Sequence, residues 1–318
     1  MSELLLELPR GSVVTVGSFD GVHRGHQALL RELLTRAERL GAAPVVVTFE
    51  PHPAAVLAPA PAPSRLTLAP EQREILAQLG PEYVVVLRFD AALASLSAQR
   101  FVQEVLLGRC AMRELVIGMN HRFGHGGTGD SLTLPVLGRR LGFAVTVLPP
   151  VADAAGEVIS STRIRAALAA GELGRVAEWL GRPYTLSGRV VPGAGRGRTI
   201  GIPTLNLEPL NPAKALPPDG VYAARVEWAD GSAGAMLNQG GKPTVGDLTR
   251  SIEAHLFGAT PELYGRTVRI EWVQRLRDTQ RFASLDALRA QLDLDREQAL
   301  AALSRPPETS TARRIAAR

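Results

Sequence analysis

The chain has 318 residues, of which 45% are hydrophobic and 5% aromatic, and it carries a formal net charge of +5. This length predicts two globular domains. No run of 18 apolar residues predicts a membrane span, no secretory pattern stands at residue 1 and the single cysteine excludes an internal disulfide framework, so we expect a cytoplasmic protein with no membrane partner.

The first strand, loop and helix carry the strongest functional signal. Residues 13–16 form a short apolar run typical of a buried strand, and leucines at 29, 30, 33 and 34 predict an amphipathic helix from about residue 25. Between them stands His-x-Gly-His, where the helix begins. Because helix N-termini present free N–H groups, this pattern indicates a phosphate site and resembles a nucleotidylyltransferase signature. The residues expected at ATP here are Gly17, Phe19, Asp20, His23, Gly25 and His26.

A chance pair and a metal pair are the alternative interpretations of the two histidines. Zinc-binding histidines on a helix are usually spaced i, i+4, and further ligands are required. The chain has six histidines and its only cysteine, Cys110, has no cysteine partner. The order of strand, glycine-bounded loop, His-x-Gly-His and helix therefore favours a nucleotide over a metal.

Strands and helices alternate through the rest of the first half. Further strands are predicted at 45–48, 83–87, 115–117 and 144–148, and helices at 71–79, 98–107 and 131–141. This order predicts βαβ units and a mostly parallel, Rossmann-like sheet that binds ligands beyond the carboxyl ends of its strands. The proline-rich segment 51–70 is expected to be a surface loop, with polyproline II structure at 59–63.

Two further segments of the first half are candidates for ligand contacts. Asn120 follows a predicted strand and enters a glycine-rich loop, where it could bind phosphate or flavin, although turn chemistry explains an asparagine equally well. Ser161, Thr162 and Arg165 open a helix. A hydroxyl there is usually a simple cap, but hydroxyls, free N–H groups and an arginine together can also clamp a phosphate.

The sequence changes character after residue 183. Short β-like segments at 186–191, 221–228, 233–237, 251–256 and 267–273 predict a small closed β-barrel, and 284–303 predicts a final amphipathic helix. The expected domains are therefore 1–183, an α/β domain, and 184–304, a barrel with a C-terminal helix. Residues 305–318 hold four arginines and are expected to be a disordered basic tail. The other basic residues are dispersed, so no nucleic-acid partner is expected.

The barrel half has its own chemical candidates. Backbone amides of the glycine/arginine loop 193–201 could wrap a phosphate, and the residues singled out are Gly195, Gly197, Arg198 and Gly201. Thr204 and Asn206 offer hard oxygen ligands suited to Mg²⁺ beside nucleotide phosphates. Glu253 lies on a predicted strand, where it could accept a hydroxyl proton or simply face solvent.

These motifs, taken in order, resemble the bacterial bifunctional riboflavin kinase/FMN adenylyltransferase (FAD synthetase) family. The resemblance runs from about residue 13 to about residue 299 and rests on segments 17–26, 48–53, 160–165, 180–184, 203–206, 220–222, 238–244, 252–255, 263–265 and 276–277. It implies an N-terminal domain that joins FMN and ATP to give FAD and pyrophosphate. It also implies a C-terminal barrel that phosphorylates riboflavin with Mg²⁺ and ATP.

The resemblance also implies roles for particular residues. His23, His26, Asn120, Ser161, Thr162 and Arg165 would handle ATP and FMN, Thr204 and Asn206 would lie at the Mg²⁺–ATP site of the kinase, and Glu253 would be the base. The chain departs from the family pattern at His121, where phenylalanine is usual, and at Leu205, where alanine is usual. The loop after Phe123 is rich in glycine and histidine instead of basic, and Leu-Phe-Gly-Ala follows His255.

Two other functions are compatible with parts of the sequence. The first domain could transfer a nucleotide to a different phosphate ester, with a non-catalytic barrel, although Thr204, Asn206 and Glu253 would then have no purpose. An RNA-binding protein would need clustered basic and aromatic residues on the barrel, and none is evident. The partners expected are therefore small molecules, and the sequence does not indicate an oligomeric state.

Overall fold

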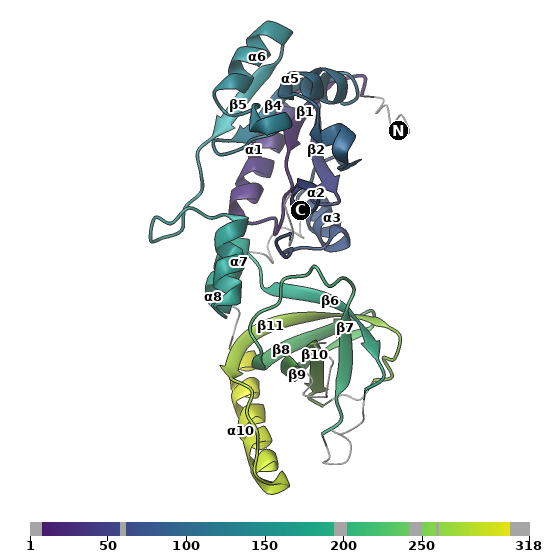
Figure 1. The fold of residues 1–318 in the computed structure, drawn as a ribbon, viewed down its shortest axis with the longest axis vertical. Coiled ribbons are helices and arrows are strands. Elements are labelled where there is room, and N and C mark those ends of the chain that lie inside the picture. The colour runs from purple at the N-terminus through teal and green to yellow at the C-terminus, as the bar shows by residue number, and fades with distance from the viewer. Residues whose placement is uncertain (1–7, 58–61, 194–201, 242–249, 259–260, 306–318) are drawn as a thin grey trace. The chain divides into compact units, whose positions relative to one another are not determined.

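The computed structural model describes residues 8–57, 62–193, 202–241, 250–258 and 261–305, and the chain divides into two compact units, Met1–Ser161 and Thr162–Arg318 (Figure 1). Part of the predicted polyproline stretch and the predicted tail from residue 306 onward lie outside the described residues. So do Gly195, Gly197, Arg198 and Gly201.

The first unit is built on a five-stranded parallel sheet, which confirms the predicted α/β class. Its order is β3-β2-β1-β4-β5, all paired in parallel. The strands are β1 (Ser12–Val16), β2 (Ala43–Glu50), β3 (Tyr83–Arg88), β4 (Met112–Gly118) and β5 (Ala144–Leu148). Because β1 pairs with β2 on one side and β4 on the other, the chain changes direction across the sheet between β1 and β4. That point is where open parallel sheets bind ligands.

Helices cover both faces of this sheet (Figure 1). They are α1 (Arg24–Leu40), α2 (Pro53–Leu57), α3 (Ala69–Gln78), α4 (Ala91–Ala94), α5 (Ala98–Phe101), a π-helix (Val102–Leu107), a 3₁₀ turn (His125–Gly127) and α6 (Thr133–Leu141). Val13 lies in one buried cluster with Leu30 and Leu33 of α1, whereas Val14 lies in a second cluster with Val102. Successive strand side chains point to opposite faces, so a fully buried β1 supports a core on each side.

Two local features of this unit differ from the predicted elements. The short helix α2 lies inside the segment expected to be a loop, and it begins at Pro53, whose fixed φ suits a first helical position. The predicted helix 98–107 has α-helical geometry only as far as Phe101, and the π-helix continues it. Neither difference changes the positions of the sheet edges.

The second unit begins with two helices, α7 (Ser161–Ala169, whose first residue still counts with the first unit) and α8 (Leu173–Leu180). The apolar face of α8 includes the buried residues Val176, Trp179 and Leu180, and α8 contacts strands β6 and β11 of the barrel. The predicted domain boundary at residue 184 therefore separates the strands from helices that belong to the same compact unit.

The strands of the second unit form a closed barrel, as predicted, in the order β10-β7-β6-β11-β8-β9. They are β6 (Tyr184–Val191), β7 (Leu205–Pro209), β8 (Gly220–Trp228), β9 (Gly231–Gly241), β10 (Arg250–Leu256) and β11 (Thr267–Arg277). Strand β7 was not predicted, because prolines at 203 and 209 bound a short segment and normally argue against a strand. It pairs with β6 and β10, so without it the barrel would not close.

The last helix, α10 (Leu285–Ser304), packs on β8, β9 and β11, and Ser284 caps it by accepting a hydrogen bond from the Ala287 amide. Ala299 and Ala302 are buried against the barrel. Asp295 is fully buried and receives hydrogen bonds from Arg277 and Gln291. A search of the described helices finds none that combines the length and the apolar character needed to cross a bilayer.

Candidate functional site

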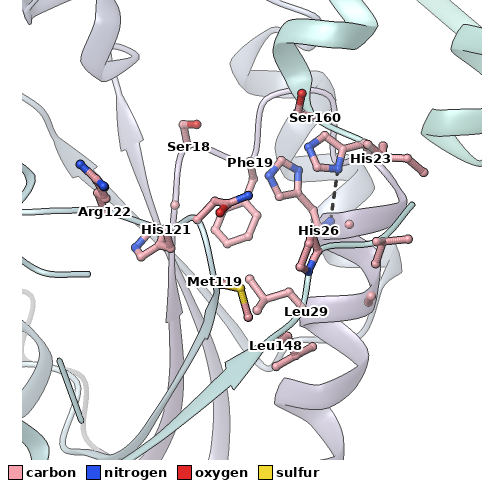
Figure 2. Close-up of a pocket in the computed structure, with 18 of the residues that line it drawn as sticks. Ser18, Phe19, His23, His26, Leu29, Met119, His121, Arg122, Leu148 and Ser160 are labelled. Carbon is pink, nitrogen blue, oxygen red and sulfur yellow. Dashed lines mark hydrogen bonds between the residues drawn. The ribbon is translucent and has the colours of Figure 1, made fainter. Parts of the chain in front are cut away.

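A cavity of about 430 Å³ lies at the carboxyl ends of β1 and β4 in the first unit. Its walls come from the end of β1, the start of α1, the loop after β4 and the segment from Leu148 to Ser160. Figure 2 shows His23 and His26 on one wall, and Met119 and His121 from the loop after β4 on another. The cavity therefore occupies the ligand position that the sheet order predicts.

The two histidines of the predicted phosphate site lie in direct contact. Their rings stack with centroids 3.7 Å apart and an interplanar angle of 17°. His23 caps α1, because its Nδ1 accepts a hydrogen bond from the amide of His26 at 3.4 Å. The first turn of α1 contains no acidic residue, so its positive dipole end is not neutralised by the helix itself. The junction offers imidazoles and a helix N-terminus to an anionic ligand in the cavity.

Two glycines make room for these rings. A Cβ on Gly25 would lie 3.1 Å from the His23 ring, and a Cβ on Gly17 would lie 3.2 Å from the ring of Phe19. Phe19 is buried with a positive φ of 47°, and its ring meets His26 edge-on at a centroid distance of 5.2 Å. All of these residues line the cavity, so the structure brings them together at one place.

Asp20 takes a different position from its neighbours in the motif. It is 2% exposed, and its Oδ1 accepts hydrogen bonds from the amides of Leu66 (2.9 Å) and Thr67 (3.1 Å). The Thr67 hydroxyl in turn accepts from the Gly21 amide. Asp20 is not among the residues that line the cavity. Its carboxylate ties the loop after β1 to the segment before α3. This bond fixes the loop that leads into His23.

The loop after β4 contributes an exposed asparagine and a half-buried histidine. Asn120 and His121 both line the cavity, as do Met119 and Arg122. Burial lowers the pKa of His121 to about 4, so its ring is neutral near pH 7. Its Nε2 is buried, with no hydrogen-bond partner among the described residues. The wall of the cavity therefore contains a buried and uncharged nitrogen of His121.

Some lining residues were missed by the sequence analysis. His52 lies in the motif 48–53 and lines the cavity, and its Nδ1 accepts from the Ala54 amide at 3.1 Å. Ser160 also lines it, immediately before the predicted Ser161. The motif 48–53 was a signal for His52, but no pattern distinguished Ser160 from Ser161.

The second predicted clamp is divided between the two units. Ser161 ends the first unit, and its hydroxyl donates to the carbonyl of Asp20 at 2.8 Å. Thr162 and Arg165 belong to the second unit, where Arg165 Nη2 donates to Thr162 Oγ1 at 3.4 Å. The hydroxyl and the guanidinium of the helix start therefore lie next to each other, as a phosphate clamp requires.

A separate polar group forms on the barrel of the second unit. Antiparallel pairing of β7 and β10 sets Glu253 directly opposite Asn206. The Thr204 hydroxyl lies 3.5 Å from Oε2 of Glu253. All three side chains are half-buried. The structure thus brings together three residues that the sequence separates, and it does so through strand register.

The absence of a side chain at Gly193 makes room for the amide of Asn206. A Cβ on Gly193 would lie 1.9 Å from Nδ2 and 2.3 Å from Cγ of Asn206, which no real contact permits. The sequence singled out the loop that Gly193 begins, but not this close approach. Across the described ranges, no group of three or more His, Cys, Asp or Glu side chains is placed to hold a metal ion.

Comparisons with known proteins cover both units. Residues 6–163 match the family model described as FAD synthetase, and residues 180–303 match the one described as riboflavin kinase. The bifunctional riboflavin kinase/FMN adenylyltransferase of Escherichia coli K12 is 40% identical over 286 residues, 90% of each chain. The protein of the same name from Bacillus subtilis is 35% identical over 303 residues, 93% of this chain and 94% of that one.

A solved structure is also similar over nearly the whole chain. It is described as a macrolide-efflux protein from Streptococcus pneumoniae, is 33% identical, and covers 94% of this chain and 97% of its own with a TM-score of 0.85. The two family models, the curated relatives and the order of the units agree with the resemblance in the motifs. This chain belongs to the bifunctional riboflavin kinase/FMN adenylyltransferase family.

Proposed function

We propose that this chain makes FAD from riboflavin in two ATP-dependent steps, one in each unit. The observation that carries the proposal is the presence of two separate polar sites: a histidine-capped helix N-terminus in a cavity of the first unit, and a hydroxyl, amide and carboxylate group on the barrel of the second. The names of the relatives supply the substrates. We assign adenylylation to residues 1–183 and phosphorylation to residues 184–304.

In the first unit, a phosphate oxygen of FMN attacks the α-phosphorus of ATP. The new P–O bond forms as the bond to the β-phosphate breaks, and pyrophosphate leaves. No covalent enzyme intermediate is needed, so the protein's task is to align the reactants and stabilise negative charge. His23, His26 and the free amides of α1 would do so at the triphosphate. The cavity volume of about 430 Å³ is in the range of small-molecule sites.

Other residues of segment 1–183 would orient the two substrates. Asn120, on the loop after β4, would hydrogen-bond FMN or phosphate, because it lines the same cavity as the two histidines. Ser161, Thr162 and Arg165 would clamp phosphate from the start of α7. Asp20 would act indirectly, by fixing the loop that carries His23.

In the second unit, the ribityl hydroxyl of riboflavin attacks the γ-phosphorus of ATP and ADP leaves. The carboxylate of Glu253 would accept the hydroxyl proton. Thr204 Oγ1 and Asn206 Oδ1 are hard oxygen donors beside that carboxylate, and this donor set fits Mg²⁺ when phosphate oxygens complete it. A Mg²⁺ ion bound there would neutralise negative charge on the phosphates of ATP. Gly195, Gly197, Arg198 and Gly201 would contribute amides and charge to the phosphates.

The chain is proposed to act on small molecules in the cytoplasm. Its substrates and products would be riboflavin, FMN, FAD and ATP, with Mg²⁺ as the metal. Nothing in this scheme requires a nucleic acid or a membrane.

The test is a product analysis. Purified protein is incubated with riboflavin, ATP and Mg²⁺, and the flavins are separated by chromatography with fluorescence detection. We expect FMN first and FAD afterwards. FMN alone would contradict the assignment of the first unit and point to another phosphate-ester acceptor. No conversion by folded protein would overturn both assignments.

A further inference from the structure

The pairing of β7 and β10 stops beside the proposed kinase residues. Its register joins Ile252 with Leu207, Glu253 with Asn206, and Ala254 with Leu205. Pro203 and Thr204 come directly before β7, which begins at Leu205. Since Pro203 has no N–H, its peptide cannot donate to a strand ladder. Backbone pairing with β10 therefore ends at Leu205 and does not extend to Pro203 and Thr204.

Beyond the end of the strand ladder, a side chain provides a hydrogen bond to the segment before β7. Nδ1 of His255 lies 2.9 Å from the carbonyl oxygen of Pro203. A carbonyl oxygen can only accept, so Nδ1 carries the hydrogen and donates. Thr204 is thus fixed on both sides, by the paired Leu205 and by the held carbonyl of Pro203. Its hydroxyl remains 3.5 Å from the carboxylate of Glu253.

The orientation of the His255 ring is set by packing. Its ring meets Phe257 edge-on, with centroids 5.9 Å apart. Phe257 packs against a buried cluster that includes Ala299 and Ala302 of α10, and the guanidinium of Arg296 lies over its ring at 6.0 Å. On β10, His255 and Glu253 are two residues apart and share one face. The final helix, through Phe257, therefore supports the ring whose Nδ1 reaches the carbonyl of Pro203.

We propose that His255 is a positioning residue of the kinase site, which holds Pro203 and Thr204 by donating from Nδ1 so that the Thr204 hydroxyl stays beside Glu253. The role rests on the proposed riboflavin kinase function. His255 does not touch the reacting atoms. It determines how often the Thr204 oxygen is in place when Mg²⁺ and ATP arrive.

Three substitutions separate this role from others. His255→Asn keeps an N–H donor close to the position of Nδ1, whereas His255→Gln moves the donor to about the position of Nε2. His255→Leu removes it. The first readout is amide hydrogen exchange of a peptide spanning residues 202–207 in the ligand-free protein. We expect faster exchange there in the Gln and Leu variants, near-native exchange in the Asn variant, and unchanged exchange in β8 in all three.

The second readout is kinetic. Losing an outer contact that orients a metal ligand typically reduces metal affinity or activity by about 10-fold or more. We expect the Gln and Leu variants to need about 10 times more Mg²⁺–ATP for half-maximal riboflavin phosphorylation, with a smaller change in kcat, and the Asn variant to recover most of it. Conversion of supplied FMN to FAD should be unchanged, which controls for the first unit, and the unchanged exchange in β8 controls for a folded barrel.

The outcomes are distinct. If His255→Gln retains activity and His255→Asn does not, Nε2 acts on substrate and the positioning role is wrong. Unchanged exchange at 202–207 in both the Gln and Leu variants would also overturn it. If the Leu variant fails to fold, the Asn and Gln pair still decides. Absence of riboflavin phosphorylation by the unaltered protein would refute the proposed function instead, and the exchange data would still report on the hydrogen bond.

Discussion

The two units assemble their polar sites in opposite ways. In the first, His23 and His26 stand three residues apart at one loop–helix junction, so a local stretch of sequence places them together. In the second, Thr204 and Glu253 are 49 residues apart and meet only because β7 and β10 pair in one register. A junction site thus depends on local backbone geometry, whereas a barrel site depends on topology and on everything that maintains strand register.

The strongest way to break the comparison is to disable one site at a time. Glu253→Gln should lower riboflavin phosphorylation by about 1,000-fold, because the proton acceptor is lost, and should spare conversion of supplied FMN to FAD. His26→Ala should lower FAD formation by about 100-fold or more and spare FMN formation. Separate assays with riboflavin and with FMN measure both. A single substitution that abolishes both steps would show that the units do not divide the work.

The barrel's dependence on distant packing can be tested at α10. Asp295 is fully buried, and its two oxygens accept from Nε and Nη2 of Arg277 at 2.8 and 2.6 Å. Asp295→Ala leaves the half-buried guanidinium of Arg277 without its carboxylate, so the second unit should lose about 3 kcal/mol of unfolding free energy. All three tryptophans, at 179, 228 and 272, lie in this unit, so urea unfolding followed by tryptophan fluorescence reports on it directly.

A matched control distinguishes the ion pair from simple loss of volume. The double variant Arg277→Met, Asp295→Leu replaces the pair with apolar groups of similar size, and it should recover most of the stability that Asp295→Ala loses. A double variant as unstable as the single one would mean that helix packing, and not the uncompensated charge, accounts for the loss.

These contrasts also explain what the sequence could predict. The parallel sheet and the barrel follow from the periodicity of successive short segments, and the pairing of His23 with His26 follows from a four-residue motif. The position of Asp20 could not be predicted, because its partners Leu66 and Thr67 lie 46 and 47 residues away. Strand β7 was not predicted because prolines at its borders normally argue against a strand. Thr204 and Asn206 were singled out from ligand chemistry and resemblance rather than from strand register.

Gly193→Ala probes close approach in the barrel. The added methyl group would collide with the Asn206 amide, so Asn206 or the start of the loop must move. We expect riboflavin phosphorylation to fall by about 10-fold, mainly through a higher KM for Mg²⁺–ATP, with FAD formation from FMN unchanged. Gly174→Ala is the control, because its Cβ would meet nothing within 4 Å. Equal effects of the two substitutions would remove Gly193 from the site.

The smaller of the two expected stability effects concerns His121 in the first unit. Burial lowers its pKa from 6.5 to about 4, so the folded protein keeps the ring neutral while the unfolded chain binds a proton. The contribution of the neutral His121 ring to the free energy of unfolding is therefore fully present above pH 6.5. It is lost as the pH falls toward 4. Between pH 7.5 and pH 5, the chain should lose about 2 kcal/mol more stability than His121→Phe, which cannot titrate.

The comparison between variant and unaltered chain is what isolates this histidine, because every other titrating group is common to both. Urea unfolding followed by far-UV circular dichroism would detect the first unit, whose sequence holds no tryptophan, and tryptophan fluorescence of the same samples would follow the second. The pH-dependent difference should appear in the first signal and be absent from the second. Parallel pH profiles for the two proteins would show that the His121 ring is hydrated in the folded state, and a neutral imidazole would then no longer distinguish this cavity from the phenylalanine-bearing members of the family.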